Sequence, residues 1–274
     1  MIVVEKRIKY KSSNPIKRLY IVTDAHSGTI ASSDKALDEC MYTIYHDDDA
    51  LWVEGGDSCE LILPGDKRFD QGMIADYVDK NDIAQSQEDH IYKKYKRNAS
   101  KCLGKHRGNH EYNFMLYENA DIQKHLCNRL KITDLGYSCF MNLVFERENS
   151  TERHVIRCCG THGAGGATTA IGKRNALKKW MTQNAAHLYW YGHVHDIIME
   201  NRPYLDYDRN LKLVNREAMG VIGGCFFKTY IQGADATYGE RRLFAPNEIG
   251  YAVITINIEE MSFTFNKKTK IYND

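Results

Sequence analysis

Five short apolar runs along the chain have the length and composition of buried β-strands. They cover residues 19–23, 50–54, 101–104, 155–159 and 187–191. Most are rich in β-branched and aromatic residues, as strands inside a sheet usually are. The loops that follow them carry DAH, GGD, RGNHE, GTHG and GHVH. The pattern therefore predicts five strands that each end in a short loop with Asp, Asn or His, usually beside Gly.

Helical patterns separate these strands, and a β-rich stretch follows them. The helices are expected over residues 32–45, 86–99, 118–130 and 169–184, and β segments over 211–214, 220–231, 250–258 and 261–265. Alternating strands and helices favour an α/β fold, in which ligands bind at the carboxyl ends of the strands. We therefore expect the five loops to meet at one edge. No linker precedes residue 211, so we interpret the β-rich end as a second sheet packed on the first, and residues 1–274 as a single domain.

Composition is that of an ordinary folded protein, with 43% hydrophobic and 27% charged residues. The formal charge of +1 gives no general attraction to nucleic acid or anionic membranes. The first residues lack a signal-peptide pattern and no long apolar run is present, so we expect a cytoplasmic protein without a membrane partner. Eight cysteines without any Cys-x-x-Cys motif predict reduced, structural thiols.

The loop residues together offer two carboxylates, one amide oxygen and four imidazoles. They are Asp24, His26, Asp57, Asn109, His162, His193 and His195. Nitrogen and oxygen ligands without thiolate favour Mn, Fe, Zn or Ni over calcium. Seven ligands suit two divalent ions about 3.5–4 Å apart, an arrangement that hydrolyses phosphate esters. The sequence thus predicts a two-metal phosphoesterase site.

Each of these residues also has a common structural role. Asp57 is the type of residue that caps a turn, Asn109 a type that adopts a left-handed turn conformation, and His162 is explained as a hydrogen-bonded loop histidine. His193 and His195 are explained in the same way as solvated residues near a turn. The order of all five loops along the chain favours the metal interpretation.

The five loops, in this order, resemble the motifs of the calcineurin-like metallophosphoesterases: Asp-x-His, Gly-Asp, Gly-Asn-His-Glu/Asp, a histidine beside glycine, and Gly-His-x-His. The resemblance covers residues 24–195. It implies an α/β fold, a four-layer αββα sandwich of two mixed β-sheets flanked by helices. It also implies that the first metal is held by Asp24, His26 and His195, and that Asp57 bridges to a second metal held by Asn109, His162 and His193. His110 corresponds to the catalytic histidine, which acts together with the bridging Asp57.

Function, cofactor and substrate follow from this resemblance. It implies hydrolysis of a phosphate ester by a metal-bridging hydroxide, with Mn²⁺ expected and Fe, Zn, Ni or Mg as alternatives. A phosphodiesterase, including the compact and phage-type nucleases of the family, is the leading interpretation; a phosphomonoesterase and an inactive metal-binding interaction module are the alternatives. GGDSCELIL lacks the Asp-Arg-Gly that phosphoprotein phosphatases carry after Gly-Asp-x-Val, so a phosphoprotein substrate is not expected.

Three further features have two interpretations each. Lys93, Lys94, Lys96, Arg97, Lys101 and Lys105, with interleaved tyrosines, either guide a nucleic acid or form a solvated helix face. Glycines in residues 163–166 either admit a substrate phosphate or form a flexible turn. Glu60 and Glu111 either hydrogen-bond metal ligands or are solvated. The oligomeric state is not predicted.

Overall fold

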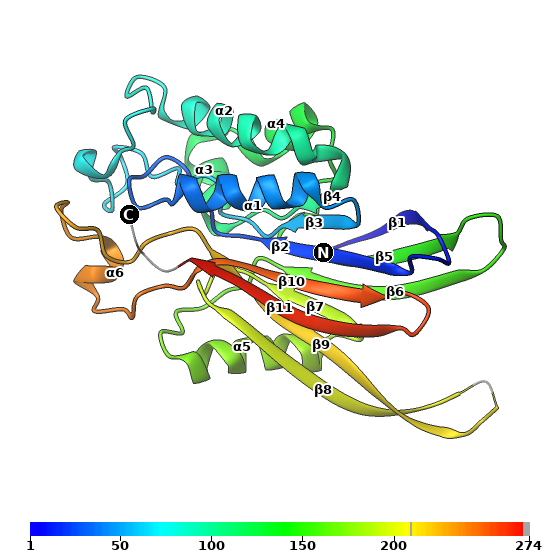
Figure 1. The fold of residues 1–274 in the computed structure, drawn as a ribbon. Coiled ribbons are helices and arrows are strands. Elements are labelled where there is room, and N and C mark those ends of the chain that lie inside the picture. The colour runs from blue at the N-terminus through cyan, green and yellow to red at the C-terminus, as the bar shows by residue number, and fades with distance from the viewer. Residues whose placement is uncertain (209, 271–274) are drawn as a thin grey trace.

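The computed structural model describes residues 1–208 and 210–270. Within them, eleven strands form one hydrogen-bonded sheet that folds at the short β9–β10 pairing into two halves (Figure 1). The first half has the order β1 (Ile2–Tyr10), β5 (Ser138–Arg147), β6 (Arg153–Thr161), β7 (Leu188–Tyr191) and β9 (Leu213–Cys225), with β8 (Ile197–Tyr207) also paired to β9. The second half has the order β10 (Ile249–Asn257), β2 (Ile16–Val22), β3 (Ala50–Glu54) and β4 (Cys102–Lys105), with β11 (Ser262–Lys270) also paired to β10.

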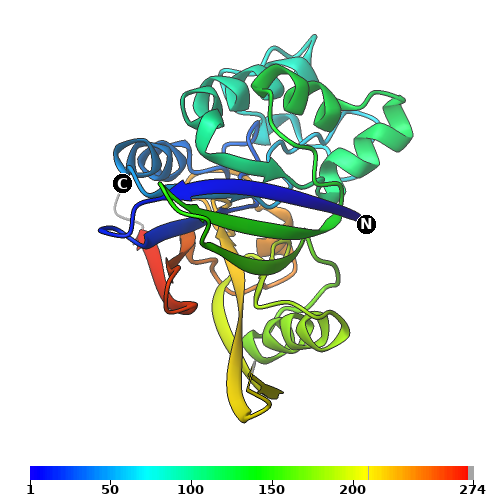
Figure 2. The same ribbon diagram turned by 90° about the vertical axis from the view of Figure 1, so that its right-hand side faces the viewer.

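Helices cover the outer faces of both halves (Figures 1 and 2). Over the second half lie α1 (Asp34–His46), α2 (Ile83–Tyr95), α3 (Asn109–Glu118) and α4 (Ile122–Leu130), and over the first half lies α5 (Ala170–Gln183). Shorter elements are η1 (Gln71–Met73), η2 (Lys96–Lys101) and α6 (Tyr238–Arg241). The expected four-layer αββα sandwich is confirmed.

Alternating side chains of one strand build two of the three cores. Leu19 and Ile21 of β2 lie between the sheet halves, whereas Tyr20 and Val22 of the same strand pack under α1 and α2. A third core lies between α5 and the first half, around Leu177. Because both faces of β2 are buried over residues 19–22, these four residues are all apolar, and this run predicts the strand.

The prediction that the β-rich end of the chain forms the second sheet is wrong. The five predicted strands divide between the halves, with β2, β3 and β4 in one and β6 and β7 in the other. The β-rich end does not form a separate sheet, because β9 pairs parallel with β7 while β10 pairs antiparallel with β2. An apolar run identifies a strand, but its partner depends on contacts that are distant in the sequence.

Some element boundaries also differ from the prediction. β1, β5, β8 and α3 were not predicted, and the strand expected over residues 220–231 ends at Cys225. The helix expected from residue 118 begins at Ile122, because Asp121 caps it by accepting from the Lys124 N–H at 3.0 Å. The eight cysteines are free thiols and all but Cys102 are buried, as predicted. None of the described helices combines the length and apolarity that a membrane crossing requires.

Candidate metal centre

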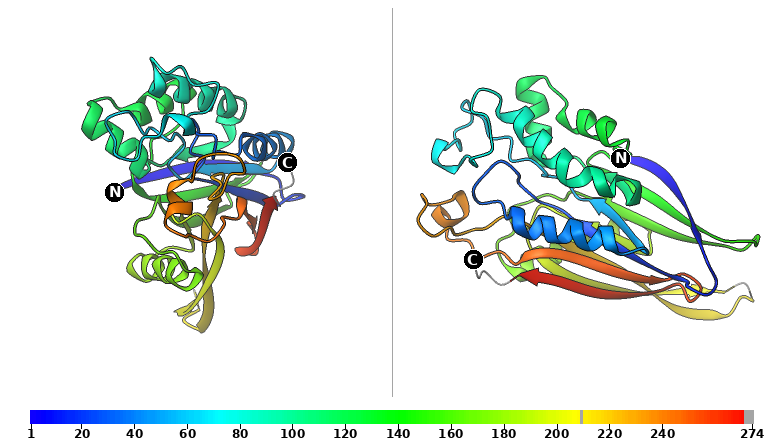
Figure 3. Two further views of the ribbon diagram at one scale, coloured as in Figure 1. Left: turned by 90° about the vertical axis from the view of Figure 1, so that its left-hand side faces the viewer. Right: turned by 45° about the horizontal axis from the view of Figure 1, so that its top comes forward.

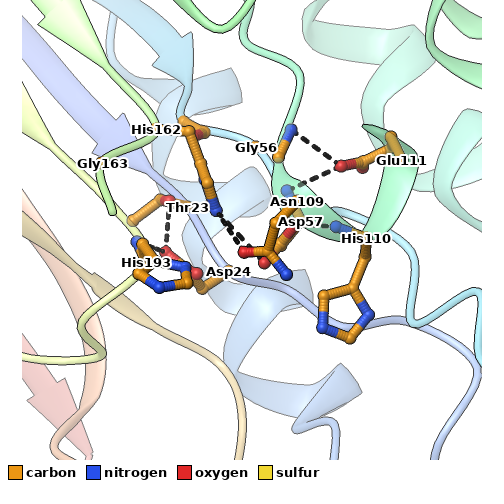
Figure 4. Close-up of polar contacts among 12 residues, drawn as sticks. Thr23, Asp24, Gly56, Asp57, Asn109, His110, Glu111, His162, Gly163 and His193 are labelled. Atoms are coloured by element: carbon orange, nitrogen blue, oxygen red, sulfur yellow. Dashed lines mark hydrogen bonds and ion pairs between the residues drawn. The ribbon is translucent and has the colours of Figure 1, made fainter. Parts of the chain in front are cut away.

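The five predicted loops meet at one end of the two sheet halves, as expected. The loops after β2, β3 and β4 come from the second half, and the loops after β6 and β7 from the first. Figure 4 shows His162 and His193 from one half facing Asp57 and Asn109 from the other. The seven predicted ligands therefore form one cluster that spans both halves.

Asp24, His26 and His195 form the first group of potential ligands. The Nε2 atoms of the two histidines lie 3.1 Å apart, and Asp24 Oδ1 lies 3.2 Å from His195 Nε2. Asp24 is fully buried, and its Oδ1 has no hydrogen-bond partner among the described residues. A buried carboxylate oxygen without a partner is costly unless a cation neutralises it.

Asp57, His162 and His193 form the second group, and Asn109 joins it. Asn109 Oδ1 lies 3.1 Å from His162 Nε2, 3.1 Å from Asp57 Oδ2 and 2.7 Å from His193 Nδ1. With the amide turned over, its nitrogen would donate to the same three atoms. A cation among these atoms would let the amide oxygen, the carboxylate oxygen and the imidazole nitrogens all act as ligands, so the donor set fits a divalent metal.

Three of the four histidines use one ring nitrogen for a hydrogen bond that leaves the other directed into its group. Nδ1 of His26 contacts Glu60 Oε2 at 2.7 Å, and Nδ1 of His162 contacts the Gly55 carbonyl oxygen at 2.9 Å. Nε2 of His193 contacts the Gly165 carbonyl oxygen at 3.0 Å. Donation of one N–H to an oxygen fixes the tautomer and orients the other nitrogen as a ligand.

Left-handed backbone conformations aim these side chains. Their φ angles lie between 48° and 68° at Asp24, His26, Asp57, His193 and His195. Asn109 is not such a turn residue, because it begins α3. At Gly108 a Cβ would lie 1.9 Å from Asp57 Oδ1, so only glycine lets the loop after β4 approach the loop after β3 so closely.

The electrostatics of the centre favour positive charge. Burial alone would lower the pKa of His26, but Glu60, Asp57 and Asp24 raise it to about 9. Burial would likewise lower the pKa of His162, but Asp57 raises it to about 10. Burial would raise the pKa of Asp57, whereas His162 and His110 hold it well below its ordinary value. Both histidines thus lie in the negative potential that a cation requires.

His110 lies beside both groups without joining the predicted ligand set. Its Nδ1 contacts the Glu60 carbonyl oxygen, and its backbone N–H donates to Asp57 Oδ1 at 2.9 Å. Glu60 is thus close to His26 and His110, which together form a third group of potential ligands. Glu60 is not a solvated glutamate, since it connects the two histidines.

Glu111 is also buried, and it binds Lys105. The Lys105 ammonium lies 3.2 Å from Glu111 Oε1 and 3.0 Å from Glu54 Oε2, with all three side chains inaccessible to solvent. Burial raises the pKa of Glu54 to about 7 although Lys105 lowers it. The prediction that Lys105 belongs to a basic surface segment is therefore wrong. Its acidic partners, Glu54 and Glu111, lie on a distant strand and on the next helix, and no local sequence pattern reveals such pairing.

The rest of the basic segment has partners of its own. Lys94 pairs with Asp38 at 2.7 Å, and Lys101 donates to the last carbonyl oxygens of α1. The guanidinium of Arg97 lies 3.5 Å from the Tyr45 ring centroid. The segment precedes β4, so it lies at the opposite end of that strand from Asn109. Its geometry gives no support to a nucleic-acid track that leads into the centre.

A cavity of about 410 Å³ opens over the ligand groups. Besides His26, Asp57, Asn109, His110, His193 and His195, its lining includes Phe69, Lys173, Phe227, Phe244 and Asn247. Asn247 Nδ2 lies 3.3 Å from His195 Nδ1. The sequence does not reveal these additional residues: Phe69, Phe227, Phe244 and Asn247 lie on long connections without a periodic pattern, and Lys173 lies on α5 without a motif beside it. Gly165 and Gly166 also line the cavity, and a Cβ on either would meet open space.

Comparison with known proteins gives similarity to solved structures only. No family model matches the chain, and no curated protein sequence matches it. The NAD nucleotidase NadN of Haemophilus influenzae aligns with a TM-score of 0.42 and 10% identity, over 93% of this chain and 50% of that chain. Vps29 of Chaetomium thermophilum aligns with a TM-score of 0.34 and 11% identity, over 92% of this chain and 96% of that chain. The chain thus spans about half the length of NadN.

Proposed function

We propose that this protein is a metal-dependent phosphoesterase of the calcineurin-like type, and that phosphodiesters are its main substrates. One observation carries the proposal: two adjacent groups of carboxylate, imidazole and amide atoms face one another across the sheet halves, and one buried carboxylate oxygen among them has no hydrogen-bond partner in the described part of the chain. A divalent cation in each group satisfies all of these atoms. Such a pair would neutralise phosphoryl charge and would lower the pKa of bound water to about 7, which hydrolysis of a phosphate ester needs.

The residues of the chain take distinct roles. One cation would be held by Asp24, His26 and His195, and the other by Asp57, Asn109, His162 and His193. Asp57 lies at the amino end of α3, where the His110 N–H and the helix dipole keep its carboxylate ionised. His110 donates its Nδ1–H to the Glu60 carbonyl oxygen, and in its doubly protonated form its Nε2–H would give a proton to the departing oxygen.

A phosphomonoesterase is the second candidate, and one observation favours it. Arg68, Lys173 and Arg241 line the cavity, and cations there favour the second negative charge of a monoester. Asp66 and Asp196 already pair with the first two, at 2.6 Å and 3.3 Å, which reduces the attraction. We therefore retain the diester as the leading substrate class.

Turnover of two chromogenic esters tests the proposal. The protein is first treated with a chelator and then given Mn²⁺, with bis-p-nitrophenyl phosphate and p-nitrophenyl phosphate as parallel substrates. We expect no turnover after chelation and recovery with Mn²⁺, with faster turnover of the diester. Faster turnover of the monoester would establish the second candidate, and no turnover with Mn²⁺, Fe²⁺, Zn²⁺, Ni²⁺ or Mg²⁺ would overturn both.

A further inference from the structure

The cavity is much larger than a phosphate group needs. Its volume of about 410 Å³ lies in the range of small-molecule sites, and the ligand groups supply only part of its lining. Two loop segments line much of the remainder. We name residues 62–74, which include η1, the first wall, and residues 226–247, which include α6, the second wall. Both segments lie at the same end of the molecule (Figure 3). These walls are therefore the surfaces that the alcohol part of a substrate would contact.

Both walls are fixed to the same short segment after β2. The Ile30 N–H donates to the Met73 carbonyl oxygen of the first wall at 3.0 Å. The Ser33 N–H donates to the Phe226 carbonyl oxygen of the second wall at 2.7 Å. Since β2 also leads into Asp24 and His26, the walls have a defined position relative to the first ligand group.

The second wall is also ordered by its own polar side chains. The Thr237 hydroxyl donates to the Thr229 carbonyl oxygen, and the Asn247 N–H donates to Thr229 Oγ1 at 3.1 Å. Asn247 Nδ2 donates to the Phe227 carbonyl oxygen at 2.9 Å. Long connections with such internal bonding are commonly functional. The wall is therefore an ordered surface against which a ligand can pack.

Aromatic rings dominate the apolar part of the cavity. Phe227 begins this surface directly beside the ligands, with its ring centroid 5.0 Å from that of His26. Tyr238 and Phe244 pack edge to face at 6.2 Å farther along the second wall, and Phe69 lies on the first wall. Tyr238 keeps 48% of its surface exposed. Partly exposed rings on both walls favour binding of a flat aromatic group, because offset and edge contacts between rings add to the free energy of simple burial.

We infer that the cavity binds a small phosphate ester whose alcohol carries a flat aromatic or heterocyclic ring, held between the two walls. The inference rests on the proposed function for the phosphate end. The Arg241 guanidinium lines the cavity and forms no ion pair with the described residues, so it is available to a ring or a second anionic group. A site bounded on two sides suits a compact ester better than a polymer strand.

Binding of three phosphonates tests the inference without turnover, because their carbon–phosphorus bond is not an ester. The probes are benzylphosphonate, cyclohexylmethylphosphonate and methylphosphonate, each titrated by calorimetry into the Mn²⁺-loaded protein. We expect benzylphosphonate to bind about 10-fold more tightly than methylphosphonate, and about 3-fold more tightly than the non-planar cyclohexyl compound. Equal affinity for all three would overturn the inference.

A matched pair of variants assigns the effect to the second wall. Phe244→Leu keeps an apolar side chain but removes the ring, so it should abolish the preference for benzylphosphonate over the cyclohexyl compound. Leu243→Ala changes the neighbouring residue, which is 88% exposed and outside the cavity lining, and should leave the preference intact. An unchanged preference in Phe244→Leu would remove Phe244 from the site.

Turnover of bis-p-nitrophenyl phosphate by the same preparation separates the two proposals. If the ester is hydrolysed while the three phosphonates bind equally, the aromatic-ring inference fails and the phosphoesterase proposal stands. If the aromatic preference is present and no ester is hydrolysed, the phosphoesterase proposal fails and the cavity remains an aromatic phosphonate site. A thymidine oligonucleotide that displaces benzylphosphonate at lower concentration than a thymidine mononucleotide would overturn the compact-substrate assignment.

Discussion

Glu111 Oε2 accepts the backbone N–H of Asp57 at 3.0 Å. The same oxygen accepts the Gly108 N–H at 2.9 Å, and Oε1 accepts both the N–H and the hydroxyl of Ser58 at 2.9 Å. One buried carboxylate thus joins the loop after β3 to the start of α3. The position of Asp57 relative to Asn109 and His110 depends on this side chain.

Replacement of Glu111 by Gln should therefore destabilise the fold. The amide nitrogen would face N–H donors and the Lys105 ammonium would lose one of its two anionic partners, at an expected cost of about 2–4 kcal/mol. Urea unfolding measures this cost. Glu118→Gln, on the exposed end of α3, is the control and should change the free energy of unfolding by less than about 0.5 kcal/mol. A similarly small change in Glu111→Gln would contradict its assigned role.

Replacement of Asp57 by Asn should reduce bound metal and abolish turnover. The amide keeps the shape of the side chain but removes the negative charge that faces His162 and the amino end of α3. Metal analysis after gel filtration should show the loss of at least one equivalent. Asp70→Asn, which changes another cavity carboxylate outside the ligand groups, should keep its metal. Full metal content and normal turnover in Asp57→Asn would exclude a ligand role.

Replacement of His110 by Gln should separate catalysis from metal binding. We expect nearly unchanged metal content and turnover slower by about 10²–10⁴-fold, the usual effect of losing a positioned acid or base. Metal analysis and kinetics on one preparation give both values. Loss of a metal equivalent would show that the group of His26, Glu60 and His110 is itself a metal site.

The pH dependence of stability should contain a contribution from Glu54. Its pKa is raised to about 7 in the folded protein by burial, so the folded state holds this proton more tightly than the unfolded chain does. The contribution is present below the unfolded pKa of about 4.3 and is lost as the pH rises to about 7, amounting to about 4 kcal/mol at most. Urea unfolding from pH 4.5 to 7.5 should show a flatter profile for Glu54→Gln than for the parent protein. Parallel profiles would contradict the assigned shift.

Much of the ligand cluster was predictable because each loop directly follows a buried strand. Asp24 and Asp57 come two and three residues after strands whose last residues are buried, so local sequence is enough to place them at a sheet edge. Asn247 and Phe227 lie on the connection between β9 and β10, whose position is set by hydrogen bonds to the segment after β2. No periodic pattern marks such residues.

The layered architecture of the fold was predictable from the sequence, but the pairing of its strands was not. β1 alternates exposed and partly buried residues and is rich in Lys and Arg, so it does not resemble the apolar runs of the central strands. The burial of Lys105 depends on Glu54 from the neighbouring strand and on Glu111 from α3. Sequence alone indicates which residues favour a strand, whereas strand order and buried ion pairs arise from tertiary contacts.

Five of the seven predicted ligands have a left-handed backbone. At such positions the residue that best stabilises the backbone differs from the residue that a metal site needs. Each such residue costs about 1 kcal/mol relative to glycine in that conformation. Glycine at His193 would relieve the strain and remove a predicted ligand, so backbone stability and the proposed metal binding favour different residues at this position. Laboratory evolution for heat resistance, run without a requirement for turnover, should therefore select glycine at residue 193.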